Sequence, residues 1–228
     1  MIIGNGLLAK AFKELYEENN EIIIFASGVS NSSETEPQQF NKEIYLLENS
    51  LKLKKKIIYF SSTSVLCDPQ LYSPYQKHKK KIESLLDSYD SIIIRLPQIL
   101  GFKQNKLNLL PYLYYCISNQ IKFPLYINQK KNILDIEDVL KITDFIIKNN
   151  IKNKKIYNVI NTTYYSVYEI VKEIEDLLRA KGIFYVSEKE DIYEKIIPDQ
   201  FYLNVLETIG VNFDDKYLSR VIKKYLFF

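Results

Sequence analysis

Short runs of β-branched residues alternate along this chain with longer segments of helical pattern, and this alternation constrains the fold more than any other feature. Three such runs are Glu21–Phe25, Lys56–Phe60 and Ser91–Leu96, and each is rich in isoleucine. A short, continuous apolar run is typical of a strand that is buried on both faces. Strands alternating with helices of ten to fifteen residues form parallel sheets that helices cover on both sides. The sequence therefore predicts an α/β fold.

The sequence begins with a very short apolar segment, a glycine turn and a helical pattern. Gly4 and Gly6 suit a tight turn and a close backbone approach, and Ala9 stands where a third glycine is often found. The first amides of the following helix could face a pyrophosphate. An ordinary strand-to-helix turn remains the alternative, because short glycine patterns are common.

The residues that can carry chemistry follow the run Lys56–Phe60, which ends in the hydroxyl cluster Ser61–Ser64. Tyr75 and Lys79 come next, on a helix that is expected to start at Pro74 because proline is favoured in a first turn. Residues four apart share a helix face. Ligands of open α/β sheets bind at the carboxyl ends of the strands, so these side chains are candidates for one site.

The residue types suit proton transfer at a sugar carbon. A free phenol is a poor general base at neutral pH, and a neighbouring ammonium group such as that of Lys79 stabilises the phenolate. The Ser62 hydroxyl can donate a hydrogen bond to an oxygen on which charge develops. The alternative is that Tyr75 only packs at the start of its helix.

The Tyr-x-x-x-Lys spacing alone is a weak signal in a chain with 19 tyrosines. It recurs at Tyr126/Lys130, Tyr168/Lys172 and Tyr185/Lys189. Only Tyr75/Lys79 follows a predicted buried strand that ends in serines, so this pair is the one we expect to be functional.

Several motifs in order resemble the extended short-chain dehydrogenase/reductases, specifically the nucleotide-sugar epimerase/dehydratase family. The resemblance covers roughly residues 1 to 180. The matching segments are Gly4-x-Gly6-x-x-Ala9, Phe25-Ala-Ser-Gly28, Phe60-Ser-Ser-Thr-Ser-Val65, Tyr75-x-x-x-Lys79, Arg95-Leu-Pro-Gln-Ile-Leu-Gly101, Lys131-Asn-Ile-Leu-Asp-Ile-Glu-Asp-Val139, Tyr157-Asn-Val-Ile-Asn161 and Ser166-Val-Tyr-Glu-Ile170.

The resemblance implies a Rossmann-like sheet, an NAD(P) cofactor and a nucleotide-linked sugar as substrate. It implies Ser62 as hydroxyl donor, Tyr75 as proton-transferring group and Lys79 as its ribose-binding partner. The implied cofactor contacts are Gly4, Asn5, Gly6, Leu7, Leu8, Ala26, Ser27, Gly28, Tyr75, Lys79 and Pro97. The implied substrate contacts are Ser62, Thr63, Ser64, Gln98 and Lys131. Gln98 stands where relatives have an Asn that contacts the substrate. Lys131 stands where many relatives use an Arg to hold the diphosphate of the sugar nucleotide.

The chain departs from this family after its first helix. The family adds a second strand, a helix and a third strand there, with a residue that selects the adenosine ribose. Here Ile22–Asn31 matches the fourth strand of the family instead. We therefore expect a sheet that is shortened at its adenosine-binding edge, with weakened retention of the cofactor.

Two regions are expected: a nucleotide-binding core over residues 1–180, with an active-site loop near 102–130, and a small substrate cap over residues 181–228. A helix of about fourteen residues should begin near Pro37, and a tyrosine-rich helix should span 109–119. Asp214 and Asp215 suit the start of a terminal helix, in which Arg220 is a candidate phosphate ligand. Helices 37–50 and 74–87 resemble those that form a homodimer in relatives.

The composition limits the kinds of partner that the chain is expected to bind. The 228 residues carry a net charge of +3, and the sole candidate for a basic patch, 77–81, is expected to be a solvated helix face that includes the lone His78. We therefore expect no nucleic-acid partner. No apolar run approaches the ~18 residues of a membrane span and no secretory signal is visible, which predicts a cytoplasmic protein. Cys67 and Cys116 are expected to be reduced core thiols, and no metal site is predicted.

Three functions remain open from the sequence. The first is an NAD(P)-dependent oxidoreductase that reduces a keto-deoxysugar intermediate in surface-polysaccharide sugar synthesis. The second is a nucleotide-sugar epimerase. The third, from another class, is a non-catalytic binding or regulatory protein that kept the fold and lost its cofactor. Dehydration is disfavoured, because Thr63 and Ser64 stand where dehydratases carry an Asp-Glu pair.

Overall fold

A computed structural model of the chain describes residues 1–102, 108–149, 155–188 and 195–226. The contacts divide the chain into two compact units. The first comprises Met1–Pro97 and Ile136–Val159, and the second comprises Gln98–Asp135 and Ile160–Phe228. This division differs from the expected boundary at residue 180, because the chain leaves the first unit after Pro97 and returns to it at Ile136.

The first unit is built on a parallel sheet of five strands. The strands are β1 (Ile2–Ile3), β2 (Ile22–Phe25), β3 (Lys56–Ser62), β4 (Ser91–Leu96) and β8 (Ile156–Asn158), and they lie side by side in this order. Every neighbouring pair is parallel. The α/β class and the Rossmann-like parallel sheet expected from the sequence are confirmed.

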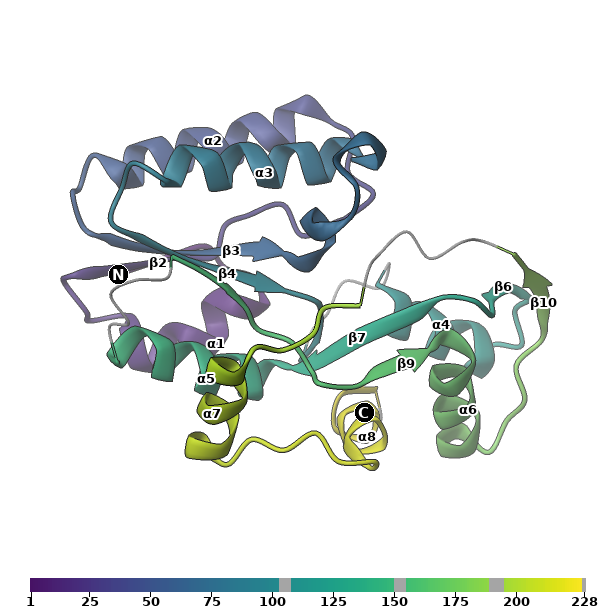
Figure 1. The fold of residues 1–228 in the computed structure, drawn as a ribbon. Coiled ribbons are helices and arrows are strands. Elements are labelled where there is room, and N and C mark those ends of the chain that lie inside the picture. Colours follow the sequence, from purple (N-terminus) through teal and green to yellow (C-terminus); the bar gives the residue numbers. More distant parts are fainter. Residues whose placement is uncertain (103–107, 150–154, 189–194, 227–228) are drawn as a thin grey trace. The chain divides into compact units, whose positions relative to one another are not determined.

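Helices cover both faces of this sheet, as Figure 1 shows. The helices α2 (Pro37–Leu51) and α3 (Pro74–Leu86) lie on one face, and α1 (Leu7–Tyr16) and α5 (Ile136–Lys148) lie on the other. A buried cluster fills the space between the sheet and α2 and α3. Its members are Ile23, Phe25, Leu47, Leu51, Ile57, Tyr59, Ile82, Leu86 and Ile93.

The starts of α2 and α3 follow from their local sequence. Pro37 and Pro74 each stand in the first turn, where the missing N–H of proline costs nothing. Ser73 and Gln76 form a capping box that satisfies two backbone donors at the start of α3. These signals fix where α3 begins, and thereby the face on which each of its side chains lies.

The strand β1 is an edge strand of the five-stranded sheet, and it has only two residues. In the dinucleotide-binding folds that the sequence resembles, two further strands would continue the sheet beyond this edge. No strand is found beyond β1 in the described ranges. The predicted shortening at this edge is therefore present.

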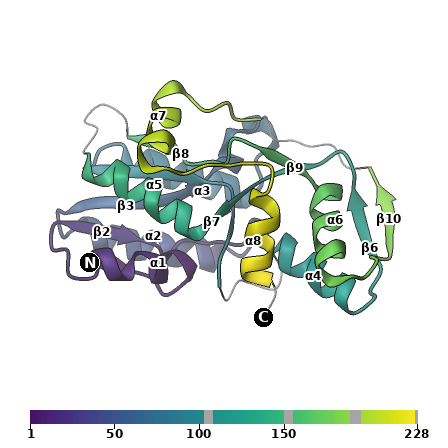
Figure 2. The same ribbon diagram turned by 90° about the horizontal axis from the view of Figure 1, so that it is seen from below.

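The second unit contains two small sheets. In one, β7 (Lys130–Asp135) pairs in parallel with β5 (Gln98–Leu100) and antiparallel with β9 (Tyr164–Ser166). In the other, β6 (Phe123–Tyr126) pairs in parallel with β10 (Phe184–Ser187). The helices of this unit are α4 (Leu109–Ser118), α6 (Val167–Leu178), α7 (Gln200–Ile209) and α8 (Tyr217–Leu226). Figure 2 shows α6 next to α8 and the strand pair β6/β10.

Three further expectations can be compared with the structure. Cys67 and Cys116 are buried and unpaired, as predicted. No helix in the described ranges is long and apolar enough to cross a lipid bilayer. Of the loop expected near 102–130, residues 103–107 lie outside the described part, and the rest contains α4, β6 and the first residue of β7.

Candidate active site

The hydroxyl cluster lies at the carboxyl end of β3, as the sequence predicts. Ser62 is the last residue of the strand, and Thr63 and Ser64 begin a short 3-10 turn. The Ser62 and Ser64 hydroxyl oxygens lie 2.9 Å apart, and Ser62 Oγ also accepts the Ser64 N–H. Ser62 is therefore held at the strand end with an orientation set by Ser64.

Tyr75 and Lys79 lie in the first two turns of α3, and both are buried, with 7% and 2% of their surfaces exposed. The Lys79 Nζ lies 5.8 Å from the centre of the Tyr75 ring. Among the described residues, the Tyr75 hydroxyl has no hydrogen-bond partner. Its oxygen is not among the fully enclosed polar atoms without a partner, which are Thr143 Oγ1 and Asn158 Oδ1. In the described ranges, the phenol therefore has no protein partner that would compete with a ligand.

The partners of Lys79 were missed by sequence reasoning. Its Nζ donates to Glu43 Oε1 at 3.0 Å and to the Tyr59 hydroxyl at 2.9 Å. The ammonium group thus contacts the face of the Tyr75 ring, while both of its hydrogen bonds go to residues on α2 and β3. A carboxylate on the same helix face as Leu47 and Leu51, one turn before Leu47, was the signal for Glu43.

Glu43 accepts four hydrogen bonds from three parts of the first unit: the loop after β2, the strand β3 and the helix α3. Besides Lys79, the donors are the backbone N–H of Val29 at 2.6 Å, the Tyr59 hydroxyl at 2.7 Å and, through Nε2 at 2.9 Å, His78. The Lys79 charge and these donors outweigh the desolvation of Glu43, and they lower its carboxyl pKa to about 2. Burial, reinforced by the charge of Glu43, raises the pKa of Tyr59 well above its ordinary value.

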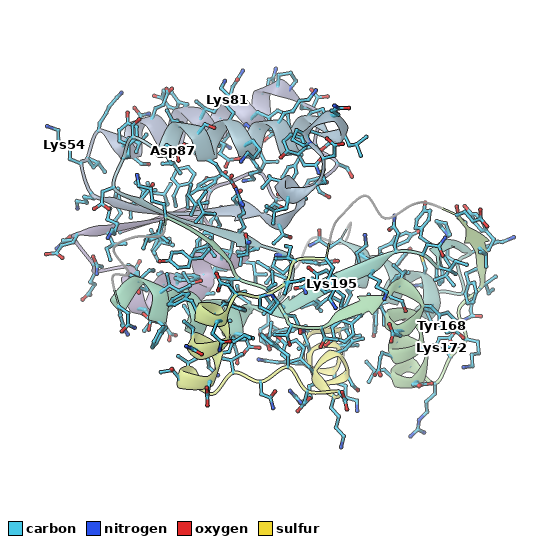
Figure 3. The ribbon with its side chains drawn as sticks, in the orientation of Figure 1. Lys54, Lys81, Asp87, Tyr168, Lys172 and Lys195 are labelled. Carbon is cyan, nitrogen blue, oxygen red and sulfur yellow. The ribbon has the colours of Figure 1, made fainter. Side chains whose placement is uncertain are left out.

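The expectation that His78 belongs to a solvated helix face is wrong. Its side chain is buried, bonds to Glu43 and stacks on Phe40 at a ring distance of 4.6 Å. Lys79 is buried as well. Lys77 and Lys81 are exposed, and Figure 3 shows Lys81 on the outer side of α3. The basic run therefore has both buried and exposed side chains, because adjacent residues of a helix point in different directions.

The loop after β2 covers the pair formed by Glu43 and Lys79. A Cβ atom at Gly28 would lie 2.8 Å from Lys79 Nζ and 2.9 Å from Glu43 Oε1. Gly4 has φ +127°, and a Cβ there would lie 2.4 Å from the Ala26 oxygen. Glycine is therefore required at Gly4 to bring the first turn against this loop, and at Gly28 to leave room for the two charged groups.

These positions fit one part of the dinucleotide implied by the resemblance. At Gly6 a Cβ would meet nothing within 4 Å, and no side chain caps the start of α1, so the turn 4–8 is open to a phosphate. Ser62, Tyr75 and Lys79 stand near the ends of β3 and the loop 26–28, where a nicotinamide and its ribose would lie. The adenosine contacts have no counterpart in the described sheet, which ends at β1.

The remaining predicted contacts fall elsewhere along the chain. Pro97 ends the first segment of the first unit, whereas Gln98 in β5 and Lys131 in β7 belong to the second unit. Arg220, a candidate phosphate ligand, donates from Nη1 to both carboxylate oxygens of Asp214, at 2.7 and 2.9 Å. The substrate roles of Gln98 and Lys131 stay predictions.

The other Tyr-x-x-x-Lys pairs have different surroundings. Tyr168 and Lys172 lie one turn apart on the surface of α6 (Figure 3), with Lys172 Nζ 5.1 Å from the tyrosine ring centre. Tyr185 is exposed on β10, and Lys189 lies outside the described residues. Tyr126 ends β6, and Lys130 begins β7. Of the three pairs that the structure describes, Tyr75/Lys79 alone is buried on both members.

A second buried carboxylate lies on the sheet side of α3. Glu83 accepts two hydrogen bonds from Arg95, at 2.8 and 2.6 Å, and one from the Ser61 hydroxyl at 2.7 Å. These partners lower the pKa of Glu83 against the effect of its burial. The bidentate pair joins α3 to β4 and leaves Lys79 untouched.

Comparisons with known proteins agree on the fold. No protein-family model and no curated protein sequence matches the chain. Among solved structures, UDP-glucose 4-epimerase from Bifidobacterium longum in complex with NAD+ and UDP is 17% identical, with a TM-score of 0.71, over 95% of this chain and 79% of that one. The dTDP-glucose 4,6-dehydratase from Bacillus anthracis in complex with NAD is 18% identical, with a TM-score of 0.69, over 96% and 76%.

A neighbour with bound NADPH gives the same result. RMD from Pseudomonas aeruginosa complexed with NADPH is 15% identical, with a TM-score of 0.67, over 92% of this chain and 82% of that one. The fold is therefore that of these three solved structures, with a parallel sheet that ends at the short strand β1 in the described ranges.

Proposed function

We propose that this chain is an NAD(P)-dependent nucleotide-sugar oxidoreductase that reduces a keto-deoxysugar intermediate in surface-polysaccharide sugar synthesis. The observation that carries the proposal is the placement of Ser62 at the end of β3 and of Tyr75 and Lys79, both buried, at the start of α3. Structural neighbours with bound NAD or NADPH support a nicotinamide cofactor. A nucleotide-linked sugar is the corresponding substrate class, since one neighbour also holds UDP.

Different residues of the first unit have different roles in the proposed reaction. The turn Gly4–Leu8 and the loop Ala26–Gly28, with Tyr75, Lys79 and Pro97, would hold the cofactor, whose nicotinamide supplies hydride to the keto carbon. Tyr75 gives its hydroxyl proton to the oxygen that becomes an alcohol, and solvent returns a proton to the phenolate. Ser62 donates a hydrogen bond to that oxygen as negative charge develops on it.

The proposal also names substrate contacts. The resemblance supports Thr63, Ser64, Gln98 and Lys131 as contacts to the nucleotide-linked sugar, and Thr63 and Ser64 follow Ser62 directly. Lys131 would supply charge to the diphosphate, without the bidentate geometry of arginine. We also propose a cytoplasmic enzyme and a homodimer formed through α2 and α3, for which light scattering in solution is the test.

Epimerisation is the second candidate, since Tyr75 could first remove a hydroxyl proton and later return one. An epimerase must retain its cofactor through two half-reactions. The two-residue edge strand β1 offers little sheet beyond the glycine turn for that purpose, which favours reduction. The same shortening also favours the third candidate, a non-catalytic binding protein with the retained fold.

Cofactor binding separates enzyme from binding protein. NADPH and NADH are titrated while the fluorescence of the reduced nicotinamide is followed, with and without a nucleoside diphosphate sugar. We expect saturable binding of at least one cofactor. If neither binds at concentrations up to about millimolar, a range in which weak specific complexes are still populated, the oxidoreductase proposal fails.

Tyr75→Phe tests the role of the phenol. Turnover should fall about 10²- to 10⁴-fold, the range of a lost general acid, while cofactor affinity stays close to that of the wild type. Tyr168→Phe is the matched control, because Tyr168 has the same spacing to a lysine on an exposed helix face. Equal turnover in Tyr75→Phe and wild type would refute the assignment.

A further inference from the structure

We propose that Glu43 is a positioning residue of the candidate site, whose carboxylate holds the ammonium group of Lys79 beneath Gly28 at the carboxyl end of β2. The inference deepens the proposed function, since it rests on Lys79 as a cofactor contact. Sequence reasoning placed Lys79 beside the phenol, and the structure adds the residue that decides where its charge lies.

The hydrogen bonds around Lys79 carry the first step. Its three N–H donors point to at most three acceptors, and two of these are Glu43 Oε1 and the Tyr59 hydroxyl. Tyr59 itself donates to Glu43 Oε1 at 2.7 Å, so both partners of Lys79 depend on one carboxylate oxygen. One donor of Lys79 is left for a ligand, and its direction is fixed by the other two.

The loop after β2 carries the second step. Glu43 Oε2 accepts the Val29 N–H, and Gly28 leaves less than 3 Å between its hypothetical Cβ and each of the two charged groups. The same carboxylate therefore fixes Lys79 and the loop 26–29, both of which are proposed to contact the cofactor. Without Glu43, neither would have a charged partner in this position.

Burial and charge carry the third step. The side chains of Lys79 and Glu43 are 3% and 1% exposed, so each would be a costly isolated charge without the other. Among the contacts that favour the ionised carboxylate, Lys79 contributes most, and together they lower the carboxyl pKa of Glu43 to about 2. Glu43 is therefore ionised at neutral pH. A fixed negative charge thus faces the fixed positive one at physiological pH.

The test compares Glu43→Gln with Glu83→Gln. Both variants remove a buried carboxylate that bonds to a lysine of α3. Glu43 lies on α2 and bonds to Lys79, whereas Glu83 lies on α3 itself and bonds to Arg95, Ser61 and Lys80, not to Lys79. The first measurement needs no cofactor: a pulse of acetic anhydride, followed by mass spectrometry, gives the acylation of Lys79 relative to the exposed Lys77 and Lys81. We expect Lys79 acylation to rise about tenfold in Glu43→Gln, the effect of one lost charged hydrogen bond, and less than about twofold in Glu83→Gln.

The second measurement is the affinity for NADH or NADPH, whichever the wild type binds. We expect a loss of about tenfold in Glu43→Gln and under about twofold in Glu83→Gln, although both variants lower the melting temperature. Glu43→Asp keeps the charge on a shorter side chain and should give intermediate values in both measurements. It also keeps the test decisive if Glu43→Gln does not fold.

The outcomes separate the two proposals. If Lys79 acylation rises equally in Glu43→Gln and Glu83→Gln, or stays at the wild-type level in Glu43→Gln and Glu43→Asp, Glu43 does not position Lys79. If acylation behaves as expected but the variants bind cofactor as the wild type does, the position of Lys79 is irrelevant to binding and the inference is overturned. If the wild type binds no cofactor, the proposed function is refuted, and so is the role of Glu43 in cofactor binding. The acylation measurement then still shows whether Glu43 positions Lys79.

Discussion

The helices α3 and α6 each carry a tyrosine and a lysine four residues apart, and each lysine bonds to a buried glutamate. In α3 the pair is Tyr75 and Lys79, and the glutamate is Glu43 on α2. In α6 the pair is Tyr168 and Lys172, and the glutamate is Glu175, three residues along the same helix. The motif is the same in both regions, but the surroundings are not.

The difference lies in the burial of the lysine and in the origin of its partner. The Lys79 side chain is 3% exposed, whereas that of Lys172 is 39% exposed. Glu175 also bonds to Lys181 and to the Gly182 N–H near the end of its own helix. The α6 cluster is therefore a local, solvated arrangement, whereas the α3 cluster joins two helices, a strand and a loop.

The comparison shows that the spacing alone does not make a site. A tyrosine and a lysine four apart meet on any helix. What differs in α3 is that the helix begins beside the carboxyl end of a strand carrying Ser62, and that a carboxylate from another helix fixes the ammonium group. Three experiments test whether this difference is energetic as well as geometric.

The largest effect is expected from removing each lysine. Lys79→Met leaves the buried carboxylate of Glu43 without its cation, which should lower the free energy of unfolding by about 3 to 5 kcal/mol. Lys172→Met removes a partly exposed partner, and its loss should stay below about 1 kcal/mol. Urea unfolding of both variants measures the two values. Similar losses would mean that burial of the α3 pair adds nothing.

The next effect is on stability in acid. The carboxyl pKa of Glu43 in the folded protein, about 2, lies below its ordinary value of 4.5. The stability that it contributes is complete above that ordinary value and is lost as the pH falls towards the folded value. The difference corresponds to about 3 kcal/mol. Urea unfolding between pH 7 and pH 3 should therefore depend less on pH in Glu43→Gln than in the wild type.

Glu175→Gln is the matched variant in α6. The pKa of Glu175 is also lowered, by the Gly182 N–H and by Lys172 and Lys181, but the side chains of these lysines are 39% and 75% exposed. Water screens such partners, so this substitution should change the pH dependence less. A larger change in Glu175→Gln than in Glu43→Gln would reverse the ranking of the two clusters.

The smallest effect is expected from a methyl group at a glycine in each region. A Cβ at Gly28 would lie 2.8 Å from Lys79 Nζ, and one at Gly182 would lie 3.1 Å from the Phe123 ring. Gly28→Ala and Gly182→Ala should each cost about 1 kcal/mol of stability, because both crowd packed atoms. Only Gly28→Ala displaces Lys79, so only it should weaken the binding of the nicotinamide cofactor. Equal cofactor affinities in the two variants would contradict the link between Gly28 and Lys79.

Much of the first unit could be predicted from local patterns. The isoleucine-rich runs became β2, β3 and β4, and the prolines at positions 37 and 74 marked the starts of α2 and α3. The shortening at β1 was also visible, since too few residues separate the glycine turn from β2 to form two more strands. These features depend on periodicity and turn residues, which a sequence displays directly.

The network around Lys79 could not be predicted in the same way. Glu43 and Lys79 are 36 residues apart, and their contact depends on how α2 and α3 pack over one face of the sheet. Helical periodicity assigns a side chain to a face, but it does not say which element that face meets. His78 was misplaced for this reason, because a basic run usually indicates a solvated face.

The division of the chain was hidden by a similar ambiguity. The helix α5 has the same amphipathic pattern as other helices, yet it belongs to the first unit together with β8. Pro97 marks the end of β4, but no local pattern shows that the chain then enters a second unit and returns at Ile136. The pairing of β5 with β7, and of β7 with β9, places these strands in the second unit. Local sequence patterns do not reveal such pairing.

The capping box at Ser73 has a consequence for how this chain can change length. It fixes the first turn of α3, and each residue inserted beyond it would rotate the following side chains by about 100° around the helix axis. An insertion between Tyr75 and Lys79 would therefore turn Lys79 away from Glu43, and Glu83 from Arg95, at the same time. Residues inserted before Ser73 do not rotate these side chains around the helix axis. The tolerance of the chain to added residues should therefore change abruptly at this serine.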